Sequence, residues 1–268
     1  PVDGAAFGAT LLGLVALQAG VNVINDLFDD ESGLDADPDF EENPFPLGSR
    51  AIQTGALTRR GMWALAVGCF GTGLVCGLWL DSLHPGHVVL GIGVAGALLG
   101  YFYTAPPFRF AYYGVGEPII FLLFGPLAGL GTTYVQTGSL SDPGALLLSC
   151  IVGWIVMAIL YMHHFPQHAA DARHGKKTPI VRLGPEGAGR LVPWMLAVPY
   201  LLVAIGVAVG LLPVASVLVL ASLPFALKAS RIARTRAAEP KPMTAAFGQV
   251  MLVHLVAGGA LTAALWWA

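Results

Sequence analysis

The 268-residue chain has 56% hydrophobic and only 11% charged residues, whereas soluble domains have about 25% charged residues, and this excludes a water-soluble enzyme. A mean hydropathy of +0.71 excludes a disordered chain, and three cysteines are too few for a disulfide-stapled scaffold. The net charge of −2 gives no electrostatic basis for binding nucleic acid. We therefore expect a polytopic membrane protein with an all-α fold, forming one domain over residues 1–268.

Stretches of about 20 apolar residues, the length that crosses the hydrocarbon core, predict eight transmembrane helices. The predicted spans are 5–28, 62–80, 87–104, 117–136, 145–165, 192–210, 213–228 and 247–267. Lys and Arg occur only in alternate connections between these spans. By the positive-inside rule, those connections are expected on the cytoplasmic side and both termini on the opposite side.

An acidic segment closes the first predicted span. Asn22, Asp26, Asp29 and Asp30 recur at three- and four-residue steps, which predicts that their side chains share one helical face. Ionisable groups at the end of an apolar span are costly and tend to mark substrate or ion sites. Clustered carboxylates repel one another unless a cation joins them, and Mg²⁺ prefers oxygen ligands. The segment is therefore interpreted as a metal site, in preference to a solvated acidic helix end.

The connection after the first span is long and polar. Its early acidic residues are expected to be solvated, namely Asp35, Asp37, Asp39, Glu41 and Glu42. Arg50 and Gln53 follow in a more mixed stretch. Because an arginine can bind an oxyanion through two parallel hydrogen bonds, these two side chains are predicted to contact a phosphate.

A second polar segment follows the fifth predicted span. Pro166 removes a helical hydrogen bond and is expected to kink or end that helix beside a cavity. Gln167 and Asp171 are four residues apart and are placed to face the acidic segment, with Lys176 and Lys177 nearby. Carboxylates that suit Mg²⁺, together with lysines that suit oxyanions, predict a diphosphate site.

An alternative reading of the second segment is a zinc site, because His164 and His168 have the i, i+4 spacing of a zinc-binding pair. No Glu lies between these two histidines, and Pro166 interrupts the helix that would present them. Zinc is therefore the weaker interpretation.

With both segments placed, the chain resembles the UbiA superfamily of intramembrane prenyltransferases, and within it the 1,4-dihydroxy-2-naphthoate polyprenyltransferase branch. The resemblance covers nearly the whole chain and is clearest at Asn22–Asp29, Arg50–Gly55, Tyr103–Arg109, Tyr113–Pro118 and Asp171–Gly184. The family has nine helices, so the eight predicted here are expected to lack the counterpart of its first. The second family motif departs here, because His163 and Gln167 stand where Asn and Asp are usual, while Asp171 is retained.

The resemblance implies Mg²⁺-dependent transfer of a prenyl or polyprenyl chain from an isoprenyl diphosphate to an aromatic acceptor, in the biosynthesis of quinones or related prenylated lipids. It implies catalytic roles for Asp26, Asp29 and Asp171, and Mg²⁺ ligation by these three with Asp30 and Gln167. The residues it implies for diphosphate binding are Asn22, Arg50, Gln53, Tyr103, Arg109, Lys176 and Lys177. The protein is expected in a prokaryotic cell (inner) membrane, with its site on the cytoplasmic side.

Two other kinds of protein remain open. A membrane terpene cyclase or a diphosphate-releasing enzyme would use the same ionisation without an acceptor, and the altered second motif allows this. A transporter or assembly protein with a degenerate form of the fold would also place acidic side chains beside a broken helix. The role of Tyr103 also has two interpretations, because a tyrosine near a helix end can shield a cation or anchor the protein at the membrane interface.

Overall fold

The computed structural model describes residues 2–37 and 48–267, and within these residues all regular structure is helical. The α-helices in chain order are α1 (Gly4–Ser32), α2 (Arg59–Asp81), α3 (Val88–Tyr101), α4 (Gly116–Leu122), α5 (Ala128–Thr137), α6 (Pro143–His163), α7 (His168–Arg173), α8 (Pro179–Gly189), α9 (Val192–Ala208), α10 (Leu223–Arg236) and α11 (Pro240–Trp266). A π-helical turn, Leu123–Leu127, joins α4 to α5, and 3₁₀ segments lie at Leu34–Ala36 and Val214–Ser222. The predicted all-α fold is confirmed.

The predicted spans all coincide with helical segments. Six segments of the described chain are long and apolar enough to cross a membrane, namely Gly4–Ser32, Arg59–Asp81, Gly116–Thr137, Pro143–His163, Val214–Arg236 and Pro240–Trp266. The other two predicted spans correspond to α3, which has only 14 residues, and to α9, which follows α8 at a bend of 86°. These two helices are shorter than the roughly 20 residues of a full span.

Side chains at the helix ends explain where several helices begin and end. Asp3, Thr58 and Asp142 accept hydrogen bonds from backbone N–H groups in the first turns of α1, α2 and α6, respectively. Gly33 ends α1 with φ 77°, a left-handed conformation that glycine adopts at little cost. The chain therefore turns back on itself directly after the acidic segment.

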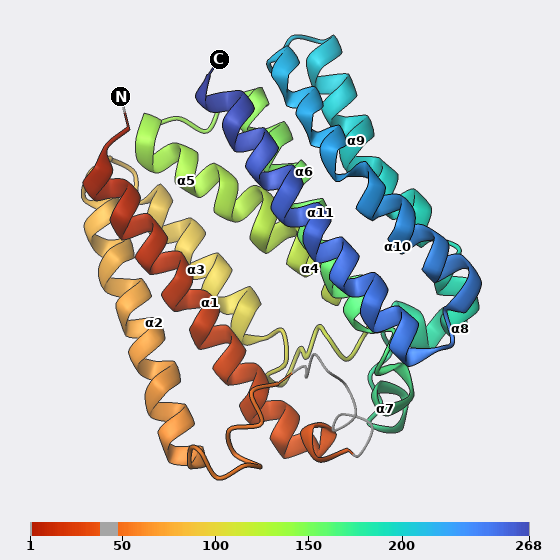
Figure 1. The fold of residues 1–268 in the computed structure, drawn as a ribbon. Helices are drawn as coiled ribbons and strands as arrows, with labels where there is room; N and C mark the ends of the chain where they lie inside the picture. The colour runs from red at the N-terminus through yellow and green to blue at the C-terminus, as the bar shows by residue number, and fades with distance from the viewer. Residues whose placement is uncertain (1, 38–47, 268) are drawn as a thin grey trace.

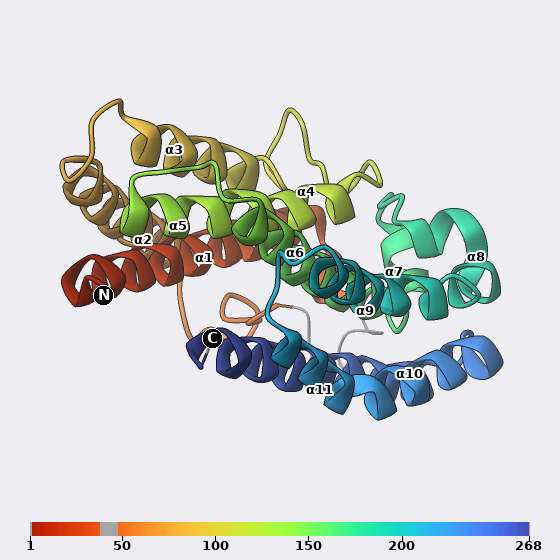
Figure 2. The same ribbon diagram turned by 90° about the horizontal axis from the view of Figure 1, so that it is seen from above.

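Figure 1 shows α7 and α8 at one end of the bundle and both termini at the other. In Figures 1 and 2, α2 and α3 lie on one side of the molecule and α9 and α10 on the other, with α6 between them. Helix α6 packs against α4, α9 and α11 and is the most buried of the six long apolar segments. It therefore forms the centre of the bundle, and its end beside α7 is fixed by packing on several sides.

Close packing between the π-helical turn and α6 depends on two facing glycines. A Cβ atom added to Gly153 would lie only 2.6 Å from the Cα of Gly125. Small residues at such a crossing let helix backbones approach each other closely. The turn that follows α4 is therefore held directly against α6.

The prediction that the early acidic residues of the first long connection are solvated is wrong for Asp35 and Asp37, which are 3% and 7% exposed. The turn at Gly33 brings Asp35 back beside Asp26 of α1, and Arg173 of α7 binds both carboxylate oxygens of Asp37 at 2.7 and 3.1 Å. Three residues of the same prediction lie outside the described residues, namely Asp39, Glu41 and Glu42.

Candidate active site

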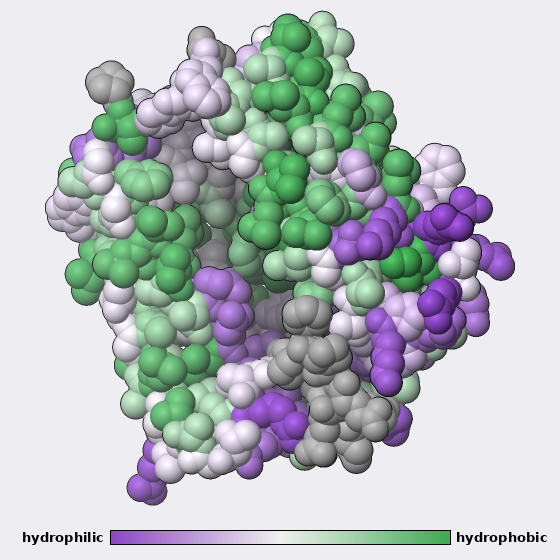
Figure 3. Space-filling view, viewed as in Figure 1, coloured by the Kyte–Doolittle hydropathy of each residue, from purple (hydrophilic) through white to green (hydrophobic). Residues whose placement is uncertain are grey.

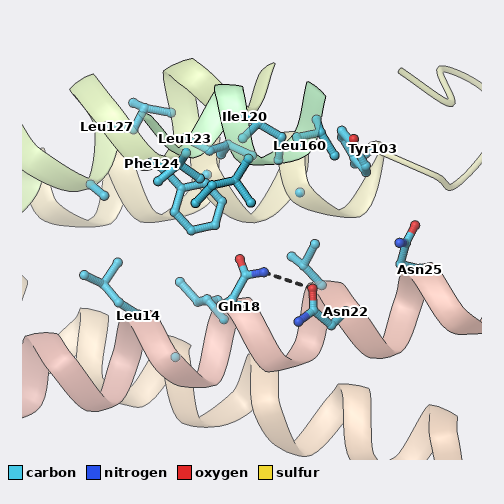
Figure 4. Close-up of a pocket in the computed structure, with 18 of the residues that line it drawn as sticks. Leu14, Gln18, Asn22, Asn25, Tyr103, Ile120, Leu123, Phe124, Leu127 and Leu160 are labelled. Atoms are coloured by element: carbon cyan, nitrogen blue, oxygen red, sulfur yellow. Dashed lines mark hydrogen bonds between the residues drawn. The ribbon is translucent and has the colours of Figure 1, made fainter. Parts of the chain in front are cut away.

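A cavity of about 900 Å³ lies between α1, α3, α6, α11 and the α4–α5 segment. Figure 3 shows the surface hollowed between α1 and α11. The polar residues at one end of the cavity, which we call the polar end, are Asn22, Asn25, Asp26, Asp29, Ser49, Tyr103, His163, His164, Gln167 and Lys176. Beyond it the walls are mainly apolar, and Figure 4 shows Leu14 of α1 facing Phe124 and Leu127. The cavity is thus amphipathic along its length.

The periodicity of α1 divides its acidic segment between two environments. Asn22, Asp26 and Asp29 line the cavity. Asp30 lies about 100° further round the helix than Asp29 and does not line it. Its carboxylate instead accepts a hydrogen bond from Gln53 Nε2 at 3.0 Å and lies 3.5 Å from the Arg59 guanidinium. The structure therefore brings Asp30 and Gln53 together, apart from the other candidate residues of α1.

Asp29 is buried at the polar end and joins three parts of the chain. Lys176 Nζ lies 3.0 Å from Asp29 Oδ2, and the Tyr112 hydroxyl lies 2.9 Å from Asp29 Oδ1. Burial lowers the pKa of Lys176, but the carboxylates of Asp29 and Asp171 raise it more, so the net shift is upward and the ammonium stays charged. Burial and the nearby Asp29 raise the pKa of Tyr112 to about 12, so its hydroxyl keeps its proton.

Asp171 of α7 is completely buried, and neither of its carboxylate oxygens has a hydrogen-bond partner within the described part of the chain. Burial raises its pKa, and the nearby Lys176 opposes that shift. Gln167 Oε1 and Asn25 Oδ1 are also buried without a partner among the described residues. Buried oxygen atoms without partners are costly and call for an explanation such as a water or an ion.

Asp26 and Asp35 form an acidic pair beside Gly48. Asp26 accepts hydrogen bonds from the Ser49 backbone N–H at 3.1 Å and from the Ser49 hydroxyl. A Cβ atom on Gly48 would lie within 3.1–3.2 Å of oxygen atoms from both Asp35 and Asp26. Burial and the charges of Asp29 and Asp26 raise the pKa of Asp35 to about 7. Asp35 was not among the predicted site residues, although Gly33, two positions earlier, signals the turn that brings it back beside Asp26.

The donor set fits Mg²⁺ that binds together with a substrate. In residues 2–37 and 48–267, no three His, Cys, Asp or Glu side chains converge closely enough to hold a metal ion. Mg²⁺ usually keeps several waters and binds through one or two carboxylates plus substrate phosphates. The dispersed carboxylates and the unpartnered oxygens of Asp171 and Gln167 match that mode of binding, because a diphosphate would supply the remaining ligands.

The other predicted site residues lie in different surroundings. Tyr103 is buried and lines the cavity. The Arg109 guanidinium lies over the Tyr112 ring, 5.3 Å from its centroid. Lys177 is exposed, and its backbone N–H donates to the Tyr112 carbonyl oxygen at 2.8 Å. Arg50 has a left-handed φ of 50° and, like Arg109 and Lys177, does not line the cavity.

The segment around Pro166 breaks the helix as predicted, since α6 ends at His163 and α7 begins at His168. The two histidines of the zinc alternative have different partners. His164 Nδ1 lies 3.2 Å from Glu117 Oε1, and His168 Nδ1 lies 2.8 Å from the Phe165 carbonyl oxygen. This arrangement gives no support to a zinc-binding pair.

Comparison with known proteins matches residues 1–267 to the UbiA prenyltransferase family. The chain is similar to the 2-carboxy-1,4-naphthoquinone phytyltransferase of Synechocystis sp., with 33% identity over 268 residues, covering 99% of this chain and 83% of that protein. It is also similar to the 1,4-dihydroxy-2-naphthoate octaprenyltransferase of Mycobacterium leprae, with 34% identity over 259 residues, covering 93% of this chain and 82% of that protein.

Solved structures share the fold at low sequence identity. A UbiA homologue from Aeropyrum pernix superposes with a TM-score of 0.74 at 17% identity, covering 98% of this chain and 90% of that one. A UbiA homologue from Archaeoglobus fulgidus bound to DMAPP and Mg²⁺ gives a TM-score of 0.65 at 17% identity, covering 98% and 89%. From the full-length family match and these relatives, the chain belongs to the UbiA prenyltransferase family.

Proposed function

We propose that this protein transfers a prenyl chain from an allylic diphosphate to a hydroxylated naphthoate ring, with Mg²⁺ as cofactor. The main observation is the amphipathic cavity, which has carboxylates and a charged lysine at one end and apolar walls beyond them. The names of the similar Synechocystis and Mycobacterium leprae enzymes support a naphthalene-type acceptor. The Mg²⁺ in the Archaeoglobus fulgidus homologue supports the cofactor.

The polar end would bind the diphosphate. Asp26, Asp29 and Asp171 would hold Mg²⁺ there, with Gln167 contributing its carbonyl oxygen, and the bound ion would neutralise the leaving diphosphate. Lys176 adds a fixed positive charge beside Asp29, in a buried setting where charge interactions are strong. Protein groups already in place when the bond breaks need little reorganisation, and this favours departure of the diphosphate.

The apolar part of the cavity would receive the prenyl chain. Leu14, Leu123, Phe124 and Leu127 line it from opposite walls (Figure 4). Burial of each methylene group contributes about 0.8 kcal/mol, so one five-carbon unit contributes roughly 4 kcal/mol to binding. This binding energy orients the allylic carbon at the polar end, where the ring has to meet it.

Product analysis in lipid nanodiscs tests the assignment. With Mg²⁺, a prenyl diphosphate and 1,4-dihydroxy-2-naphthoate, mass spectrometry should detect a prenylated ring and free diphosphate in equal amounts. Asp29→Asn should abolish most turnover, whereas Asp142→Asn should not, because Asp142 caps α6 at its opposite end and Asn is an equally good cap. Release of prenyl alcohol or a cyclised hydrocarbon without any ring product would instead favour the ionisation-only enzymes.

We also place the polar end on the cytoplasmic face of a prokaryotic inner membrane. The support is the one-sided distribution of Lys and Arg, together with the position of α7 and α8 opposite both termini (Figure 1). Cysteines introduced at Arg60 and Arg236 should react with a membrane-impermeant reagent from one side, and a cysteine at Asp142 from the other. Labelling of all three positions from one side would contradict this topology.

A further inference from the structure

A buried histidine–glutamate pair joins the polar end to α4, and neither residue is among those assigned above to Mg²⁺ and diphosphate. His164 directly follows α6, and Glu117 lies in the first turn of α4. His164 Nδ1 lies 3.2 Å from Glu117 Oε1, and the two residues are 7% and 6% exposed. His164 lines the cavity. The pair therefore connects a helix of the cavity wall to the space where substrates meet.

Hydrogen-bond chemistry fixes the direction of this contact. An ionised carboxylate can only accept hydrogen bonds, so the Nδ1–H of His164 donates to Glu117 and the lone pair remains on Nε2. Within the described part of the chain, His164 Nε2 makes no hydrogen bond. An imidazole oriented by a buried carboxylate, with its other nitrogen free beside a substrate cavity, is the usual arrangement of a general base.

Acidic groups from two helices lie near His164. Glu117 of α4 contacts the ring of His164, and Asp171 of α7 interacts with it electrostatically. Burial and the Glu117 carboxylate raise the pKa of Tyr103, so the hydroxyl of Tyr103 stays protonated and does not compete as a base.

We propose that His164 is the base that takes the hydroxyl proton of the aromatic acceptor, and that Glu117 is its positioning residue; this rests on the proposed function. The C–O bond of the diphosphate breaks and the diphosphate leaves with the electron pair. A ring carbon then forms the C–C bond to the allylic cation, while the acceptor O–H proton passes to His164 Nε2 and leaves a ring ketone. The alkylated carbon then loses its substituent, either a proton, which the departed diphosphate takes up, or, from a carboxylate, CO₂. The ketone oxygen recovers the proton from His164 as the ring becomes aromatic again.

If His164 acts on the acceptor, its loss should slow ring alkylation and leave ionisation of the prenyl diphosphate unchanged. His164→Ala should lower kcat for ring prenylation about 10²–10⁴-fold, the usual contribution of a general base, with the KM for prenyl diphosphate and for Mg²⁺ unchanged. Release of diphosphate to water in the absence of acceptor should continue at the wild-type rate. His254→Gln is the matched control, because His254 is half-buried in α11 and does not line the cavity, and its activity should equal wild type.

An acceptor series gives a readout that a structural defect would not reproduce. Fluorinated dihydroxynaphthoates, whose hydroxyl groups are more acidic, need less help from a base, so the loss in His164→Ala should shrink along the series. Added imidazole should restore part of its rate. Glu117→Gln should lower kcat, because the neutral amide can donate to Nδ1 and hold the wrong tautomer, and Glu117→Asp should recover part of it.

Several results would overturn the proposal. The first is a wild-type rate of ring alkylation in His164→Ala. The second is a loss of rate in this variant that is equal for every acceptor, and the third is a loss of diphosphate release that parallels the loss of ring alkylation. If the alanine variant does not fold, His164→Gln, which keeps a polar side chain, is carried through the same acceptor series. Failure of the wild-type protein to prenylate any ring would refute the proposed function itself, and that result is distinct from a defect confined to these variants.

Discussion

Replacing Lys176 by Met tests the central contact between the two polar segments. The side chains of Lys176 and Asp29 are each about one-tenth exposed and lie 3.0 Å apart. Removal of one partner from a buried ion pair costs about 3–5 kcal/mol, because the other charge is left without compensation. For a chain of this size, 1 kcal/mol shifts Tm by about 2–4 °C, so we expect Tm to fall by roughly 6–20 °C without Mg²⁺.

Thermal unfolding in lipid nanodiscs measures this loss, with Lys177→Met as the matched control. Lys177 is exposed and adjacent in sequence, so its replacement should change Tm little. Adding Asp29→Asn to Lys176→Met removes the orphaned charge and should restore most of the stability. Mg²⁺ with diphosphate should also reduce the loss, since it supplies positive charge at the same place. Equal Tm values for the two lysine variants, or no recovery in the double variant, would refute the reasoning.

Four further substitutions test other parts of the site. Without Mg²⁺, Asp35→Asn should raise Tm more at pH 8 than at pH 5. The pKa of Asp35 is raised from 3.8 to about 7 in the folded protein, so its ionisation lowers the free energy of unfolding as pH rises, by at most about 4 kcal/mol. Gln167→Asp adds a negative charge near Asp171, and titration of activity should show a lower half-saturating Mg²⁺ concentration. Gly153→Val should lower the free energy of unfolding in denaturant by about 1–3 kcal/mol, because its side chain would overlap the facing helical turn. Leu14→Trp narrows the apolar end, so kcat/KM should fall for long prenyl diphosphates and not for short ones.

The parts of the fold that depend on local sequence were predictable. Each of the eight predicted spans falls on a helical segment, although α3 and α9 are shorter than a full span, and Pro166 located the break between α6 and α7. Helical periodicity also predicted that Asn22, Asp26 and Asp29 share a face, but the same reasoning wrongly included Asp30, which lies too far round the helix to line the cavity with them. Helical spacing identifies residues that are neighbours on one helix, but it does not show which of them line the cavity.

The contacts between distant segments were not predictable in the same way. Asp29 meets Tyr112 across 83 residues of sequence and Lys176 across 147 residues. No periodic pattern relates such positions, and the hydroxyl of a tyrosine in an irregular connection gives no signal of its partner. Glu117 was part of a stretch that resembles the family, yet only the packing of α4 against α6 showed that its carboxylate meets His164.

The hollow between α1 and α11 opens on the side of the bundle, and this affects how a lipid-soluble substrate reaches the cavity (Figure 3). A diphosphate with a long hydrocarbon tail dissolves in the bilayer, so it reaches a sideways opening by diffusing within two dimensions. Its relevant concentration is then a mole fraction in the lipid, and extra detergent or lipid dilutes it even when the total amount per volume is constant. Apparent KM values for such substrates should therefore scale with the amount of amphiphile in the assay, whereas the apparent affinity for Mg²⁺, which arrives from water, should not.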